Sequence, residues 1–225
     1  ILGEVYQPGT YTVSSLSSLT NAIFSSGGIR TSGSLRNIQL KRNGEIITTY
    51  DFYDLLLRGD ISKDIRIEPG DVIFVPAVGK TVGIAGEVNR PAIYELKDPE
   101  TINDLIFYSG GLLPNAQSSS AELESISATE DSYLLKNINL NSNEKNSLLN
   151  NDDTLYIYPV LNTINNAVLV SGYAQRPGFY AWNDSLKLSD ILGSSEKSLP
   201  MTDQSYVLIK REGERRGDFI SFQVD

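Results

Sequence analysis

One short phrase occurs three times in this chain of 225 residues, and it constrains the fold more than any other feature. Its copies begin at Gly3, Gly86 and Gly172, and each has a proline five residues and a tyrosine eight residues after the glycine. The copies start 83 and 86 residues apart. That spacing is too long for a solenoid unit and suits a small domain. We therefore predict three tandem modules, at residues 1–79, 80–162 and 163–225.

The phrase itself predicts two short strands joined at the proline. In the first and third copies, Pro8-Gly9 and Pro177-Gly178 suit the central positions of a type II turn. The second copy has Pro91-Ala92, which disfavours that turn and predicts a local change. The tyrosine of each copy, at 11, 94 and 180, recurs at one position of the second strand, which favours a structural role.

A short helix follows in each module. Thr101 is a candidate N-cap for the helix of the second module, which should end at Gly110-Gly111. The first module ends its helix at Gly27-Gly28, and the third at Gly193.

A hairpin and a closing strand complete the pattern. Asn43-Gly44 lies between alternating apolar residues, a strong hairpin signal, and residues 207–214 align with it in the third module. Apolar runs at 72–75 and 154–158 predict closing strands in the first two modules. The third module has no such run and is incomplete at its C-terminus. Mixed strands with one helix packed across them predict the α+β fold class.

The composition excludes several kinds of chemistry. The chain has no histidine and no cysteine, which removes disulfides, the common zinc and copper ligands, and triads built on either residue. The net charge is −9, and residues 81–163 hold twelve acidic against four basic side chains. This balance argues against nucleic acid or an anionic membrane as the main partner. The sequence contains no run of 18 apolar residues, which a membrane-spanning helix would need, and no signal peptide is visible.

The three motifs together resemble a known family. Gly-Glu-Val-x-x-Pro-Gly-x-Tyr, a helix closed by Gly-Gly, and Pro-Gly-Asp-Val-Ile-Phe-Val-Pro are similar to the SLBB domain, the soluble-ligand-binding β-grasp module. Tandem copies resemble those of bacterial polysaccharide export proteins of the Wza type, although the export domain that usually precedes the first module is absent from these residues.

The resemblance implies a periplasmic chain that associates with the outer membrane through other parts of a longer protein. It also implies a homo-oligomer within a capsule or exopolysaccharide translocon. The polysaccharide and inner-membrane export or chain-length-regulator proteins would be its partners. The chain opens in mid-strand at Ile1, which suggests an excised or processed fragment.

Positions at which the modules differ are the better candidates for ligand contact. Tyr173 stands where the other copies have glutamate, and Arg176 precedes the third proline. Basic pairs occupy matching hairpins of the first and third modules, and Arg215 and Arg216 extend the second pair. The candidate ligand-binding residues are Tyr173, Arg176, Lys41, Arg42, Lys210 and Arg211. A solvated hairpin is the simpler interpretation of the basic pairs.

The sequence offers no catalytic constellation and no cofactor or metal motif. Asp152-Asp153 and Glu122/Glu124 are paired carboxylates, but nothing places them across a cleft. Asp153 is better read as a turn residue than as a calcium ligand. Trp182 aligns with apolar residues of the other modules, which predicts a core position.

Three functions remain open. The first is a non-enzymatic array of modules in polysaccharide export, acting by oligomer assembly and glycan contact. The second is a stand-alone protein that binds a small soluble ligand such as a sugar. The third is a carboxylate-dependent glycan hydrolase or lyase, for which Asp152 and Asp153 are the nominated pair.

Overall fold

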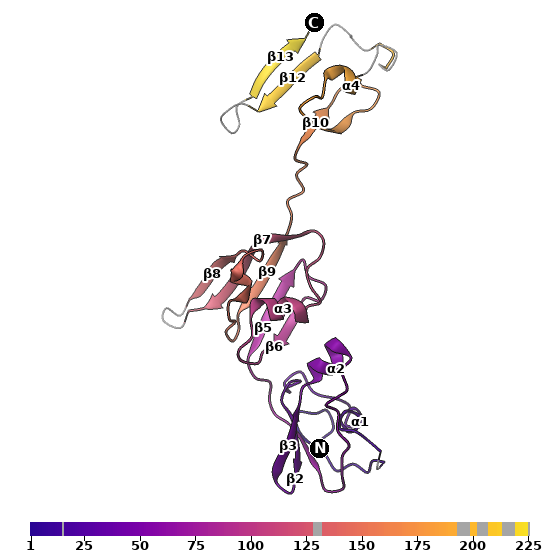
Figure 1. The fold of residues 1–225 in the computed structure, drawn as a ribbon, viewed down its shortest axis with the longest axis vertical. Helices are drawn as coiled ribbons and strands as arrows, with labels where there is room; N and C mark the ends of the chain where they lie inside the picture. The colour runs from indigo at the N-terminus through magenta and orange to yellow at the C-terminus, as the bar shows by residue number, and fades with distance from the viewer. Residues whose placement is uncertain (15, 128–131, 193–198, 202–206, 213–218, 225) are drawn as a thin grey trace. The chain divides into compact units, whose positions relative to one another are not determined.

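The computed structural model describes residues 1–14, 16–127, 132–192, 199–201, 207–212 and 219–224. The chain divides into two compact units, Ile1–Val160 and Leu161–Asp225 (Figure 1). The first unit holds the first and second predicted modules, each built on its own sheet. The α+β class predicted from the sequence is confirmed.

The first module has a four-stranded sheet in the order β1-β4-β2-β3. Strand β1 runs parallel to β4, whereas β2 runs antiparallel to both β3 and β4. Its elements are β1 (Leu2–Gly3), α1 (Leu19–Ser25), β2 (Ile38–Arg42), β3 (Glu45–Tyr50), α2 (Phe52–Arg58) and β4 (Val72–Val75). Leu19 and Ile23 of α1 are fully buried with Leu40 and Val75 of the sheet, so the helix covers one face.

Local sequence signals set the limits of these elements. The Ser18 side chain accepts a hydrogen bond from the Asn21 N–H and begins α1, and Gly27 and Gly28 follow its end with φ values of 80° and 88°. Asn43 and Gly44 both have positive φ, 52° and 87°, as a two-residue type I′ hairpin turn requires. The predicted hairpin and helix are therefore confirmed.

The second module repeats this plan with longer strands. Its sheet has the order β6-β5-β9-β7-β8, and only the β5–β9 pair is parallel. Its elements are β5 (Thr81–Gly86), β6 (Ala92–Glu95), α3 (Ile102–Tyr108), β7 (Ala116–Ile126), β8 (Tyr133–Ile138), the 3₁₀ helix η1 (Asn143–Asn146) and β9 (Thr154–Pro159). Thr101 and Asp104 form a capping box at the start of α3.

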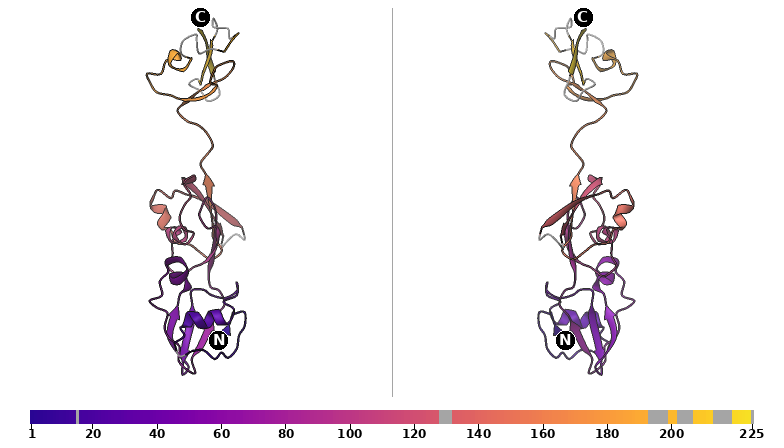
Figure 2. Two further views of the ribbon diagram at one scale, coloured as in Figure 1. Left: turned by 90° about the vertical axis from the view of Figure 1, so that its right-hand side faces the viewer. Right: turned by 90° about the vertical axis from the view of Figure 1, so that its left-hand side faces the viewer.

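The two modules of the first unit share part of their core. Tyr53 belongs to α2 of the first module, but it packs in the hydrophobic cluster of the second with Val82, Leu105 and Tyr108. All views place α2 on the side of the first module next to the second (Figures 1 and 2). The first two repeats are thus joined by packing as well as by the chain.

The second unit contains two separate ribbons. Strand β10 (Ala167–Val170) pairs antiparallel with β11 (Gly178–Ala181), and β12 (Val207–Glu212) pairs with β13 (Phe219–Val224). Helix α4 (Leu188–Leu192) lies between them in sequence. In the first two modules a closing strand, β4 or β9, joins such ribbons into one sheet, and no described residue of the second unit does so.

Trp182 is 47% exposed, so the predicted core position is wrong. Across the described part of the chain, no helix combines the length and apolar character that crossing a membrane requires.

Candidate functional site

In the first two copies, the first glycine of the repeated phrase lies in a strand that pairs with the closing strand. Gly3 and Gly86 have φ values of 92° and 86°, and a Cβ atom on them would lie 2.0 Å from the Val75 carbonyl oxygen and 1.9 Å from that of Ile157. The Cβ atom of any other residue would clash with the carbonyl oxygen at that distance. This glycine therefore lets the first strand pair closely with the closing strand in the first two modules, whereas a Cβ on Gly172 would meet nothing within 4 Å.

The recurring tyrosine closes the same turn. Each hydroxyl donates a hydrogen bond to the carbonyl four residues earlier, immediately before the proline. The pairs are Tyr11 to Gln7 at 2.5 Å, Tyr94 to Arg90 at 2.8 Å and Tyr180 to Arg176 at 2.7 Å. The position serves the fold of the module, as its recurrence indicates.

The predicted type II turn is wrong. Gly9 and Gly178 have φ values of 158° and 139°, far from the value of about 80° that the third position of this turn requires. Ala92 begins β6 in the second module and leaves the Tyr94 hydrogen bond intact. The tyrosine hydroxyl, and not a glycine-dependent turn, is the feature common to the three copies.

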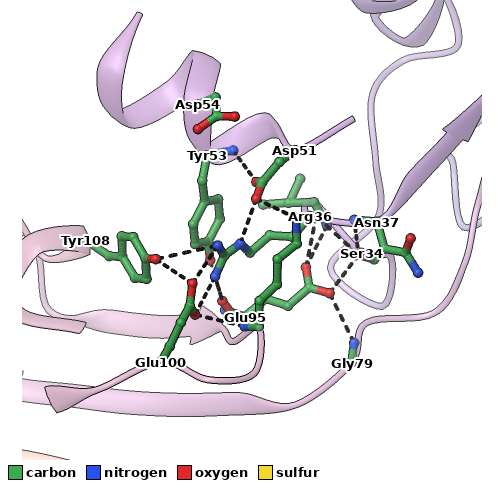
Figure 3. Close-up of polar contacts among 12 residues, drawn as sticks. Ser34, Arg36, Asn37, Asp51, Tyr53, Asp54, Gly79, Glu95, Glu100 and Tyr108 are labelled. Atoms are coloured by element: carbon green, nitrogen blue, oxygen red, sulfur yellow. Dashed lines mark hydrogen bonds and ion pairs between the residues drawn. The ribbon is translucent and has the colours of Figure 1, made fainter. Parts of the chain in front are cut away.

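A buried arginine forms the main polar connection between the first two modules (Figure 3). Arg36 precedes β2, and its side chain is 6% exposed. Its two Nη atoms donate to both carboxylate oxygens of Glu100 at 2.7 and 2.8 Å, and Nη1 also donates to the Glu95 carbonyl at 2.9 Å. Its Nε donates to Asp51 at 3.2 Å. A bidentate pair of this kind fixes orientation as well as distance.

The Glu95 carboxylate makes the reciprocal connection. It comes from β6 of the second module and accepts the Ser34 hydroxyl at 2.6 Å and the Leu35 N–H at 2.8 Å. It also accepts the N–H groups of Arg36 and Gly79, both at 3.2 Å. Glu95 is 7% exposed, so these four donors satisfy a carboxylate that burial would otherwise penalise.

Aromatic rings enclose the arginine. The guanidinium carbon of Arg36 lies 4.6 Å from the ring centroid of Tyr53 and 5.1 Å from that of Tyr108. The Tyr53 hydroxyl accepts the Glu95 N–H at 2.8 Å, and the Tyr108 hydroxyl donates to Glu100 at 2.6 Å. Each charge of the network thus has a hydrogen-bonded partner in the other module.

The network changes the acidity of its members. Burial raises the pKa of the Tyr53 hydroxyl to about 12. Burial also raises the pKa of Tyr108, and its hydrogen bond to Glu100 adds to the effect. Burial opposes the charge of Arg36, but the Glu100 hydrogen bond and the Asp51 charge outweigh it and raise its pKa. Arg36 is therefore a permanent cation whose function here is to hold the modules together.

The basic pair predicted as a ligand contact in the first module has partners within that module. Arg42 donates to both oxygens of Asp71 at 2.7 and 2.9 Å and lies 2.8 Å from Glu68. This guanidinium lowers the pKa of Asp71. The Lys41 ammonium lies 4.9 Å from the ring centroid of Phe74. A ligand role for Lys41 and Arg42 stays a prediction, and it has to compete with these contacts.

The other candidates lie in the second unit. Tyr173 is 62% exposed, and Arg176 is exposed beside the turn that Tyr180 closes. Lys210 and Arg211 are exposed on β12, opposite Ser221 and Ile220. Arg215 and Arg216 lie outside the described residues. Their ligand role also stays a prediction.

The carboxylate candidates do not form a described catalytic pair. Asp153 is 1% exposed and accepts the Asn150 N–H at 2.8 Å, as its reading as a turn residue anticipates. Glu122 accepts the Tyr158 hydroxyl at 2.7 Å. Among the described residues, no three acidic side chains come together as a metal site would require.

Comparison with protein families agrees with this geometry. A model of the SLBB domain matches residues 1–75, and a second SLBB domain model matches residues 81–133. The chain belongs to the SLBB-domain family. The two matched SLBB domains are the modules that Arg36 connects. SLBB domains are found in polysaccharide export proteins, where they bind and do not catalyse.

Sequence reasoning identified the SLBB repeat but missed the network between the domains. Arg36 lies 59 residues before Glu95 and 64 residues before Glu100, and no local pattern distinguishes the three from other charged residues. Glu95 follows Tyr94, the tyrosine that recurs in the repeat, but no local pattern marks it as a contact to the first module.

Proposed function

We propose that this chain is the non-enzymatic, module-bearing part of a bacterial polysaccharide export protein. It works in the periplasm, as a homo-oligomer, beside inner-membrane export or chain-length-regulator proteins. Its contribution is assembly of the export complex and contact with the glycan. The observation that carries the proposal is the pair of SLBB domains held in one unit by the buried Arg36 network.

A fixed geometry between the two domains favours assembly into a symmetric oligomer. Subunits of a closed oligomer repeat the same contacts around a symmetry axis, so the surfaces that they present need a fixed relative geometry. Two domains joined only by a linker move relative to each other. Bidentate Arg36–Glu100 and the four donors to Glu95 remove that freedom between the first and second domains. This arrangement suits a component of a symmetric complex.

A stand-alone binding protein for a small ligand has less support. The described residues include a pocket of about 110 Å³ lined by Thr81, Gly83, Ile93 and Thr154 with their neighbours. Sites that enclose small molecules typically measure about 300–1,000 Å³. The hydrolase hypothesis lacks a described pair of opposed carboxylates, since Asp153 is buried in a turn.

The test is deletion of the gene in the bacterium that carries it, with complementation by the full-length gene. We expect the deletion to abolish surface polysaccharide while its precursors accumulate in the cell, and complementation to restore export. Unchanged surface polysaccharide in the deletion strain would refute the proposal. Sedimentation of the purified protein tests assembly separately, and a monomer at high concentration without glycan or export partners would count against the oligomer.

A further inference from the structure

The second domain leaves one face of its sheet uncovered. Helix α3 packs on the face that carries Ile84, Leu123 and Leu155. On the opposite face, Tyr156 and Tyr158 of β9 are 41% and 39% exposed. Two neighbouring tyrosines exposed in the middle of a sheet are an unusual surface for residues that serve only folding.

These side chains form an ordered platform. The rings of Tyr156 and Tyr158 have centroids 4.5 Å apart and an interplanar angle of 54°. The Tyr158 hydroxyl donates to Glu122, which lies opposite Tyr156 on β7. Glu124 follows on the same face, opposite Thr154. The platform therefore combines aromatic surface with carboxylate acceptors.

The neighbouring strand leaves room beside the rings. Gly83 and Ala85 of β5 pair with Thr154 and Tyr156 and project toward the same face. Neither has a side chain larger than a methyl group. A flat ligand that stacks on Tyr156 can thus extend over Ala85, whereas the Thr154 side chain packs against Gly83. We call Glu122, Glu124, Tyr156, Tyr158, Gly83 and Ala85 the tyrosine platform.

In the first domain, a lysine of the same module lies over the aromatic ring at the equivalent position. Phe74 aligns with Tyr156, and it pairs with Gln39 as Tyr156 pairs with Glu122. The Lys41 ammonium lies over the Phe74 ring, 4.9 Å from its centroid. The second domain has Glu124 in the place of that lysine. It therefore exposes an aromatic ring and a negative charge where the first domain supplies its own cation.

We propose that the tyrosine platform binds a neutral or amino-bearing segment of a glycan. The apolar face of a pyranose stacks on an aromatic ring, as amphipathic aromatic side chains favour. Glu122 and Glu124 accept hydrogen bonds from sugar hydroxyls or from an ammonium group. The twelve acidic and four basic residues between 81 and 163 repel uronate-rich chains. The proposal rests on the glycan contact proposed above and adds its site and the class of sugar.

The experiment measures binding of three oligosaccharides to the whole chain by heteronuclear NMR and calorimetry. The probes are a neutral β-glucan oligosaccharide, a chitosan oligosaccharide and an oligogalacturonate. The variants are Tyr156→Leu, which keeps an apolar strand residue without the ring, and Glu124→Gln. Tyr6→Ala is the matched control, because Tyr6 is 56% exposed in the first domain and lies outside the platform.

We expect shifts at β7 and β9 with the neutral or the amino-bearing probe and none with oligogalacturonate. Tyr156→Leu should weaken binding about tenfold, which corresponds to about 1.4 kcal/mol. Glu124→Gln should weaken the chitosan complex and make it less sensitive to salt, and Tyr6→Ala should leave all binding unchanged.

Three results would overturn the inference. They are preferential binding of oligogalacturonate, binding that Tyr156→Leu leaves intact, or shifts at the platform that depend on protein concentration and not on sugar. The last result would identify a second copy of the chain as the occupant. None of these results bears on the deletion experiment, so failure of the platform and failure of the export function are distinguishable.

Discussion

Replacement of Arg36 by methionine tests whether one buried side chain holds the first two SLBB domains together. Methionine keeps the unbranched apolar stem of the side chain and removes the guanidinium with its charge and its hydrogen-bond donors. The substitution eliminates two hydrogen bonds to Glu100, one to Asp51 and one to the Glu95 carbonyl. It leaves three partners that are themselves largely buried.

The cost follows from what these partners retain. Glu100 keeps the Tyr108 hydroxyl and the Lys97 N–H, and Asp51 keeps the Lys97 ammonium and the Tyr53 N–H. Breaking a buried ion pair by removing one partner costs about 3–5 kcal/mol. Because the carboxylates are not left bare, we expect the lower limit, about 3 kcal/mol.

Urea unfolding of the whole chain, followed by tyrosine fluorescence and circular dichroism, is the assay. With a slope of about 2 kcal/mol per molar urea, the midpoint of the first unit should fall by about 1.5 M. The two probes should also separate if the domains begin to unfold independently. Lys63→Met is the matched control, since its ion pair with Asp54 is exposed and its loss should leave the midpoint unchanged.

A double variant decides the mechanism. Glu100→Gln alone and Arg36→Met alone remove the same interaction, so together they should destabilise by less than the sum of the two. Strictly additive losses, or an Arg36→Met midpoint equal to that of Lys63→Met, would refute the reasoning.

Three further predictions concern other parts of the first unit. Gly86→Ala should destabilise the first unit by about 3 kcal/mol or more, because its Cβ would meet the Ile157 carbonyl. Gly70→Ala, at a similar φ in open space, should cost about 1–2 kcal/mol. Equal losses of stability in urea titrations would contradict the close approach at Gly86. Tyr94→Phe should cost about 1 kcal/mol by removing the hydrogen bond to the Arg90 carbonyl, and an unchanged urea midpoint would assign the tyrosine another role. The free energy of unfolding should fall from about pH 10 toward pH 12, because the unfolded chain loses the Tyr53 proton near pH 10 and the folded chain retains it to about pH 12. The contribution of Tyr53 to stability is therefore complete below pH 10. Tyr53→Phe should flatten this part of the stability–pH curve, and an unchanged slope would argue against a raised pKa of Tyr53.

Much of the module could be predicted because its signals are local. Thr101 and Gly110 limit a helix through hydrogen bonds within a few residues, and Asn43-Gly44 sets a hairpin through its own dihedral angles. The type II turn was wrong for a related reason. Proline and glycine permit that turn, but Gly178 begins β11 and pairs with Val170, and the Gly9 N–H donates to the Ile1 carbonyl; neither glycine has the φ that the turn requires.

Candidate sites were harder to predict, because a charged residue in the sequence does not show which side chain it contacts in the folded protein. Arg42 looked available for a ligand, yet strand pairing brings Asp71 to it from 29 residues away. Trp182 aligned with apolar residues, yet its side chain is 47% exposed.

The repeat, most of the order of elements in the first two modules and the absence of histidine and cysteine chemistry follow from the sequence alone. These features could be predicted because turns, helix caps and the alternation of apolar residues depend on residues that are close together in the sequence. The second strand expected after Pro8-Gly9 is an exception, because residues 10–14 form no strand. The contact of Arg36 with Glu100 across two domains, and the partly exposed position of Tyr156 beside Glu122, come from the three-dimensional fold. Those arrangements depend on strand register and domain packing, which bring together residues that no local pattern connects.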